Sequence, residues 1–262
     1  MKIRFLLSLL LCACQGPQRE LNVAGNNFTY LMDESGLRKV FYKEENGLAI
    51  VEGDIVLGTS EEARERREMA ESGVGRGAIV ARWRDAYWPQ GKIPYTIDSS
   101  VENSDRITQA IRHLESKTLL RFNERERESD YVTFRGVTDG CSSNVGRTGG
   151  EQYVNLDAQC SAGSVVHEIG HAIGLWHEQS RADRDKHITI VWDNISPEER
   201  FNFEQHLTNG SDIGEYDFDS IMHYGAFAFS TNGRPTITRL DGTTTGLGNR
   251  RALSEKDISA IQ

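Results

Sequence analysis

Apolar residues recur with a helical period in two parts of the chain. After Ile107, further apolar residues stand three, four and seven positions later, and Asn103 or Ser104 precedes them as a capping residue. This spacing places the apolar side chains on one face of a helix. A second helix is predicted from Ser164 to Ile173. Gly174 ends it, because glycine readily adopts the left-handed conformation that follows a helix.

Short apolar runs predict strands around these helices. The runs are Lys92–Ile97, Tyr131–Phe134, Gln152–Leu156 and His187–Val191. Beyond Leu175 most of the chain is predicted to form loops, until a closing helix at Ser254–Ile261. The pattern therefore predicts an α+β fold with an ordered first half and a loop-rich second half.

Residues 15–76 differ in texture from the rest of the chain. They include few residues suited to a core, and we interpret this segment as an irregular appendage. The run EEARERREMAESGVGRG (61–77) is polar on every face and ends in closely spaced glycines, a flexible composition that proteases cleave. The main domain is therefore expected to span residues 77–262.

The first fourteen residues read MKIRFLLSLLLCAC and are predicted to be an export signal. A basic start precedes an apolar stretch from Phe5 to Leu11, which is too short to span a membrane. Residues 11–14 resemble the cleavage box of a bacterial lipoprotein, which makes Cys14 a candidate for lipidation. The alternative is an ordinary secretory signal cut near Cys14 or Gly16. Either signal predicts a protein that is secreted or anchored to the cell envelope, with a lipid at Cys14 as its one membrane contact.

Cys141 and Cys160 are the cysteines that remain after the signal. Export places them in an oxidising compartment, where their spacing suits a disulfide that closes a surface loop. The alternative is a pair of free buried thiols. Neither cysteine lies in a CxxC motif, which disfavours a zinc knuckle or a thioredoxin-type site.

Composition excludes some classes of function. Thirty basic residues against 39 acidic ones give a net charge of −9, whereas nucleic-acid binding requires clustered positive charge. Ten Phe, eight Tyr and four Trp are enough to anchor a core, so wholesale disorder is not expected.

The segment HEIGHAIGLWH, which starts at His167, has the spacing of a metal site. His167 and His171 lie one helical turn apart on one face and can share an ion. Glu168 lies beside them, close enough to act on a water without being a ligand. Gly174 permits the turn that returns His177 as a third ligand. Three neutral imidazoles leave Zn²⁺ with an open coordination position, which is typical of a catalytic zinc site.

A methionine follows in DSIMHY (219–224), and the long histidine pattern with such a Met-turn is the metzincin signature. A lone methionine such as Met222 is more often core filler. The histidine pattern also has an alternative explanation without a metal site, namely a helix that happens to be rich in histidine. That alternative is disfavoured because three of the 7 histidines fall within this short segment.

These motifs resemble those of the astacin peptidases. Glu178 after His177 and Tyr224 after Met222 are typical of this branch of the metzincins. The resemblance implies a two-lobed catalytic domain, with a twisted, mostly parallel sheet and two long helices in the N-terminal lobe. The C-terminal lobe is then loop-rich and ends in the closing helix. The resembling segments are HEIGHAIGLWHEQSRADRD (167–185), SIMHY (220–224), WPQGKIPYTI (88–97), TITRLDG (236–242) and LSEKDISAIQ (253–262).

The resemblance also implies a role for each residue of the site. His167, His171 and His177 bind one Zn²⁺ per chain. Glu168 is the general base, which takes a proton from the attacking water and passes it to the leaving amine. Tyr224 is a mobile fifth ligand that swings off to stabilise the oxyanion.

Further roles follow from the same resemblance. Met222 forms a hydrophobic floor under the histidines, and Glu178 contacts the new N-terminus of the mature domain through solvent. Gln152–Leu156 resembles the edge strand that pairs antiparallel with an extended peptide substrate. Protein or peptide substrates and a monomeric enzyme are expected. Family members usually have two disulfides, and here only Cys141 and Cys160 have counterparts.

Val51-Glu52-Gly53-Asp54 resembles the family's FxGD latency motif, with Val51 in place of Phe. In that motif the aspartate binds zinc and displaces the catalytic water. The resemblance makes residues 15–76 a pro-segment, and Arg76 is the obvious target for a trypsin-like activating enzyme. The alternative is an ordinary Gly-Asp turn.

Two other functions stay open at this point. One is a zinc hydrolase that acts on a non-peptide amide or ester. The other is a catalytically silent surface-binding protein that keeps zinc for structure. A structural zinc site usually has four protein ligands, and the presence of Glu168 and Tyr224 argues against silence.

Overall fold

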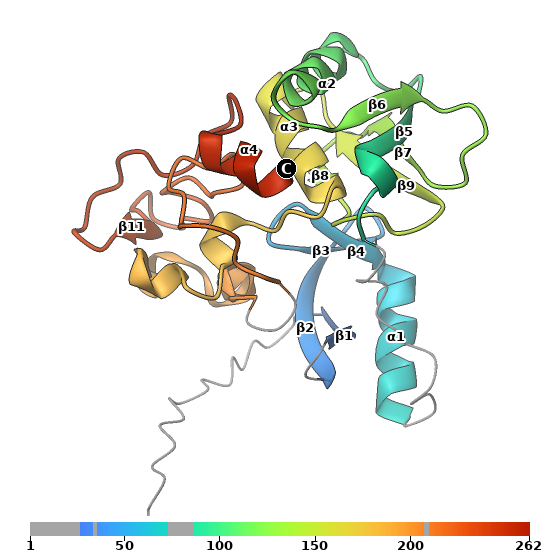
Figure 1. Cartoon of the computed structure of the whole chain (residues 1–262). Coiled ribbons are helices and arrows are strands. Elements are labelled where there is room, and N and C mark those ends of the chain that lie inside the picture. Colours follow the sequence, from blue (N-terminus) through green and yellow to red (C-terminus); the bar gives the residue numbers. More distant parts are fainter. Residues whose placement is uncertain (1–26, 34–35, 73–85, 207–209) are drawn as a thin grey trace, which may run out of the picture.

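The computed structural model describes residues 27–33, 36–72, 86–206 and 210–262 (Figure 1). The predicted export signal with Cys14 lies outside these residues, and so does the end of the predicted cleavage region, with Arg76. Residues 61–72 of that region, which were expected to be flexible, form a helix. Within the described ranges, we find no helix that has both the length and the apolar character needed to cross a membrane.

The described residues form eleven strands and four α-helices. The strands are β1 (Asn27–Asp33), β2 (Gly36–Glu45), β3 (Leu48–Val51), β4 (Ile55–Thr59), β5 (Lys92–Ile97), β6 (Arg121–Glu124), β7 (Tyr131–Gly136), β8 (Cys141–Ser143), β9 (Glu151–Leu156), β10 (Ile188–Ile190) and β11 (Ile237–Arg239). The helices are α1 (Ser60–Ser72), α2 (Asp105–Lys117), α3 (Ala162–Ala172) and α4 (Glu255–Ile261). The predicted helices and strands after residue 86 are therefore present, with ends that differ by at most two residues.

Nine of the strands form one sheet, in the order β1-β2-β3-β4-β8-β9-β7-β5-β6. Parallel pairing joins β6 to β5, β5 to β7 and β7 to β9. β8 runs antiparallel beside β9. The sheet after residue 86 is therefore mostly parallel, as predicted.

The prediction that Gln152–Leu156 forms an edge strand is wrong. β9, which contains Gln152–Leu156, lies inside the sheet between β7 and β8. The outer strand of this part is β8, and β4 pairs with it in parallel through Ile55 and Ser143. Three residues (CSS) are too short a run to show a strand period, so β8 could not be recognised from its sequence.

The segment before residue 72 is also not irregular where the structure describes it. β1 to β4 form an antiparallel meander, and α1 packs against it. Asn46 and Gly47 turn the chain between β2 and β3 with positive φ values of 50° and 77°. A small core holds the unit together: Tyr42, Ala49, Val51, Ile55 and Ala63. The irregular interpretation was wrong because most positions of β2 remain partly or fully exposed, so charged residues interrupt its apolar pattern.

Two further cores lie in the part of the chain after residue 86. The first lies between the sheet and helices α2 and α3, where the predicted apolar face of α2 is buried. The second lies among the loops of the C-terminal lobe, around Phe203, Tyr224 and Ile237. Four 3₁₀ turns between α3 and β11 confirm that this lobe is poor in regular structure. α4 contacts the first core through Ile258 and Ile261 and thereby links the two lobes (Figure 1).

The structure contains the predicted disulfide between Cys141 and Cys160, whose Cα atoms lie 6.2 Å apart. It ties β8 to the turn that precedes α3. Replacing both cysteines by alanine is expected to lower the free energy of unfolding by about 3 kcal/mol, because the unfolded chain regains the entropy of an open loop. Urea denaturation of the protein measures this difference. An unchanged free energy of unfolding would show that the pairing of β8 with β9 holds the loop by itself.

Candidate active site

Helix α3 carries the first two histidines of the site. The side chain of Ser161 caps its start by accepting a hydrogen bond from the first turn. His167 and His171 are buried, with ring centroids 4.7 Å apart. Their Nδ1 atoms donate to the main-chain oxygens of Ile221 and Leu175, both at 2.8 Å. Each Nδ1 therefore holds the ring proton, and each Nε2 presents a lone pair.

Gly174 turns the chain back so that His177 joins the first two histidines. Its φ of +111° lies in the region that glycine adopts at little cost, and its amide donates to the oxygen of His171 at 2.8 Å. The ring of His177 lies 4.7 Å from that of His171 and 5.2 Å from that of His167, centroid to centroid. The predicted turn at Gly174 is confirmed.

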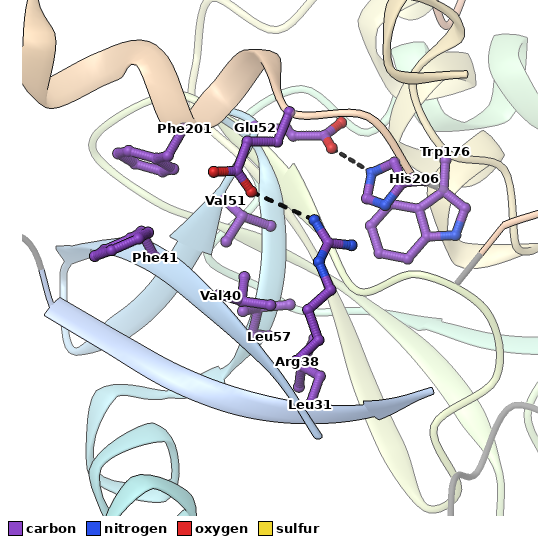
Figure 2. Close-up of a pocket in the computed structure, with 11 residues that line it drawn as sticks. Leu31, Arg38, Val40, Phe41, Val51, Glu52, Leu57, Trp176, Phe201 and His206 are labelled. Carbon is purple, nitrogen blue, oxygen red and sulfur yellow. Dashed lines mark hydrogen bonds and ion pairs between the residues drawn. The ribbon is translucent and has the colours of Figure 1, made fainter. Parts of the chain in front are cut away.

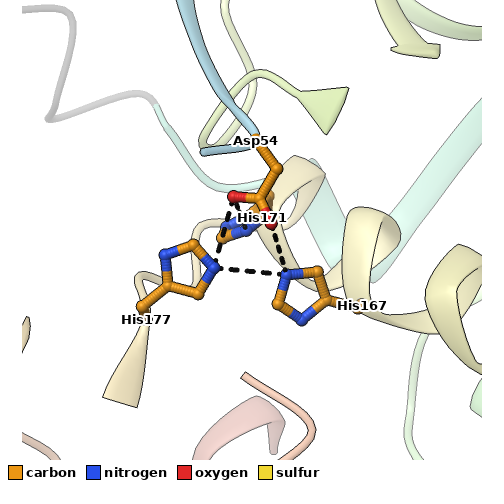
Figure 3. A group of neighbouring side chains, drawn as sticks. All are labelled: Asp54, His167, His171 and His177. Atoms are coloured by element: carbon orange, nitrogen blue, oxygen red, sulfur yellow. Dashed lines mark hydrogen bonds and ion pairs between the residues drawn. The ribbon is translucent and has the colours of Figure 1, made fainter. Parts of the chain in front are cut away.

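Asp54 reaches the histidines from the turn between β3 and β4 (Figure 3). Its Oδ2 lies 3.2 Å from Nε2 of His167. Its Oδ1 lies 3.5 Å from Nε2 of His171 and 3.3 Å from Nε2 of His177. The four candidate ligand atoms lie within 4.8 Å of one another, although Asp54 and His167 are 113 residues apart in the chain.

These four groups are suited to a divalent cation. Nε2 of His177 lies only 3.3 Å from Nε2 of His167. Oδ1 of Asp54 and Nε2 of His171 are buried and have no hydrogen-bond partner among the residues that the structure describes. Such atoms are unfavourable to bury unless they bind an ion. Three imidazoles and one carboxylate are ligands that zinc prefers.

Met222 lies against Gly170 of α3. A Cβ on Gly170 would lie only 2.6 Å from Sδ of Met222, so a larger residue at position 170 would push the methionine away. The sequence predicted a role for Met222 but not for Gly170. Gly170 could have been noticed because a glycine in the middle of a helix lowers helix stability, so its presence there indicates a close contact.

Two charged side chains, which the sequence analysis did not single out, stabilise the turn that contains Met222. The carboxylate of Asp257 accepts from the Ser220 hydroxyl at 2.6 Å and from the Ile221 amide at 2.9 Å. The guanidinium of Arg250 donates to the oxygen of Ile221 at 2.6 Å. The same oxygen accepts from His167, so this turn and α3 are held in register.

Tyr224 lies beside the third histidine, with its ring centroid 4.7 Å from that of His177. Its amide donates to Oε1 of the buried Gln179 at 2.9 Å. Its hydroxyl donates to the main-chain oxygen of Glu52. The Tyr224 hydroxyl is therefore hydrogen-bonded to the turn between β3 and β4.

Glu168 is buried beside His167, and its Oε2 has no hydrogen-bond partner among the described residues. Burial raises the pKa of this carboxyl well above its usual value, and the charge of Asp54 raises it further. Strongly perturbed carboxyls of this kind are concentrated at functional sites.

Glu178 lines a pocket together with Asp217 and Lys256. Its carboxylate accepts from the amide of Asp217 at 2.7 Å and pairs with Arg181 at 3.4 Å. Burial raises its pKa to about 7 despite these contacts. Its predicted partner, the new N-terminus near residue 77, lies outside the described residues.

The fold and the site together define a zinc peptidase of the metzincin type: two lobes, three histidines on and after one helix, and a Met-turn beside them. The family model for the peptidase family Astacin matches residues 81–262. The chain therefore belongs to the astacin family of zinc metalloendopeptidases, which confirms the resemblance seen in the sequence.

Known proteins are similar over most of the chain. Zinc metalloproteinase nas-4 of Caenorhabditis elegans is 38% identical over 217 residues, which cover 80% of this chain and 67% of the relative. Protein SpAN of Strongylocentrotus purpuratus is 38% identical over 82% of this chain, and Tolloid-like protein 1 of Mus musculus is 43% identical over 66% of it. This chain spans only 37% and 18% of the lengths of these last two relatives.

A solved structure agrees with the family assignment. High choriolytic enzyme 1, a hatching enzyme zinc-protease from Oryzias latipes, superposes with a TM-score of 0.62 at 35% identity. The match covers 71% of this chain and 96% of that structure. The two-lobed α+β fold predicted from the sequence is therefore confirmed.

Proposed function

We propose that this chain is the latent precursor of an exported zinc endopeptidase that cleaves protein or peptide substrates. The observation that carries the proposal is the approach of Asp54 to the three histidines. Residues 1–14 act as the export signal, residues 15–76 as the pro-segment and residues 77–262 as the catalytic domain. The enzyme is secreted, or anchored through a lipid on Cys14, and acts as a monomer.

His167, His171 and His177 would hold the zinc ion. When bound, zinc lowers the pKa of a coordinated water and polarises the substrate carbonyl. Glu168 accepts the proton of the attacking water and donates it to the leaving amine. Its burial and the lack of a partner for its Oε2 support this role.

The pro-segment keeps the site from substrates in two ways. Asp54 fills the place among the histidines that water requires. Its main-chain oxygen also accepts from the amide of Ser143 at 2.9 Å, so β4 occupies the edge of β8. An extended peptide would otherwise add a strand at this edge.

Tyr224 stabilises the oxyanion once its hydroxyl is released from Glu52. Replacing Tyr224 by phenylalanine in the mature form is expected to lower kcat by ~10²–10³-fold and to leave KM nearly unchanged, because the lost donor acts where charge develops in the transition state. Steady-state kinetics on a peptide measure both constants. Tyr87→Phe is the matched control, since that side chain is exposed. A raised KM with unchanged kcat would make Tyr224 a binding group only.

The experiment that tests the proposed activity is digestion of a peptide library by the mature form, with and without a chelator. We expect cleavage that stops when zinc is removed and returns when zinc is added. Small esters are assayed in parallel. Turnover of esters without cleavage of any peptide would favour a different zinc hydrolase, and zinc binding without either reaction would favour a silent binding protein.

A further inference from the structure

A second carboxylate of the pro-segment enters the same site. The turn between β3 and β4 places Glu52 and Gly53 at positive φ values of 49° and 79°. A left-handed conformation is unfavourable for glutamate, so the surrounding contacts must hold it there. Glu52 is only 4% exposed, which is rare for a carboxylate that has no firm partners.

Both carboxylate oxygens of Glu52 contact the catalytic part of the chain. Oε2 accepts from Nδ1 of His177 at 2.7 Å. Oε1 contacts Nε2 of His206 (Figure 2). Each oxygen of this buried carboxylate therefore has an imidazole partner.

His206 is itself firmly placed. Its ring lies over that of Trp176, with centroids 4.1 Å apart (Figure 2). Its amide donates to the oxygen of Ser180 at 2.7 Å. Glu52 therefore joins His177 to a fixed part of the C-terminal lobe.

The three histidines differ in what orients them. Nδ1 of His167 and Nδ1 of His171 donate to main-chain oxygens of the catalytic part itself. Nδ1 of His177 donates to Glu52, a residue of the pro-segment. A carboxylate in this position fixes the ring of a metal-binding histidine and raises its basicity, and losing such a partner typically lowers metal affinity by about 10–100-fold.

We propose that Glu52 is a positioning residue of the latent zinc site, which orients His177 and ties it to His206. The inference rests on the proposed function and extends it. The pro-segment supplies Asp54 to the ion and Glu52 to the third histidine, so its removal withdraws both at once. The precursor therefore holds zinc more tightly than the mature enzyme.

The test is zinc competition against a chelator, carried out on the full precursor with Arg76→Ala to prevent cutting at that residue. Glu52→Ala is expected to weaken zinc binding by about 10–100-fold. Glu52→Gln keeps the volume of the side chain and removes its charge, and it is expected to weaken zinc binding in the same direction. Glu65→Gln is the matched control, because Glu65 is exposed on α1. The absorption spectrum of the Co²⁺-loaded precursor is recorded in parallel and is expected to change with Glu52→Gln and not with Glu65→Gln.

Wild-type zinc affinity and an unchanged cobalt spectrum in a folded Glu52→Gln precursor would overturn the inference. Glu52→Gln decides the matter if Glu52→Ala does not fold, as judged by circular dichroism. Failure of the proposed function gives a different result, in which the mature form itself neither binds zinc nor cleaves peptides.

Discussion

Replacing Glu168 by glutamine in the mature form is expected to lower kcat by ~10²–10⁴-fold while zinc stays bound. An amide has nearly the volume of a carboxylate but cannot accept the proton of the attacking water. The three histidines do not depend on Glu168 for their orientation. Their Nδ1 atoms donate to Ile221, Leu175 and Glu52, and none of them donates to Glu168.

The measurement combines metal analysis with peptide hydrolysis on the same sample. Glu102→Gln is the matched control, since Glu102 is exposed at a distance in sequence from the motif. Near-wild-type turnover with full zinc occupancy would remove Glu168 from the mechanism. Loss of zinc together with turnover would instead assign Glu168 to metal binding.

The uncleaved precursor is expected to gain activity when Asp54 is replaced by alanine. Asp54 is attached to the same chain as the histidines, and such attachment strengthens binding by ~10²–10⁴-fold over a free ligand. We therefore expect a rise in peptide hydrolysis on the order of 10²-fold or more, up to a limit set by the strands that remain. That limit exists because β4 still pairs with β8 through Ile55 and Ser143.

The assay uses Asp54→Ala with Arg76→Ala, so that cutting at Arg76 cannot produce the gain. Activity is compared with that of the Arg76→Ala precursor, and gel electrophoresis shows that the chain is intact. Glu61→Ala is the control for a lost pro-segment carboxylate, because Glu61 is exposed at the start of α1. Full latency in the folded Asp54→Ala variant would assign inhibition to steric cover by the pro-segment strands.

The sequence alone determined the features that depend on neighbours along the chain. The apolar period of α2, the spacing of His167 and His171 on one helical face and the turn at Gly174 all arise within a few residues. Their geometry follows from the pitch of the helix and the freedom of glycine. The zinc chemistry could be predicted for this reason, as could the family.

Only the tertiary structure decided which distant residues meet. Asp54 could be suspected from its motif. The strand β8, which pairs with β4, could not be recognised because its sequence is too short to show a period. The mostly exposed, charged sequence of β2 likewise gave no sign that residues 36–72 are folded. Glu52 left no local signal, because its partners His177 and His206 lie 125 and 154 residues away. Contacts of this kind depend on how separate elements pack, and no local pattern of propensity or period records them.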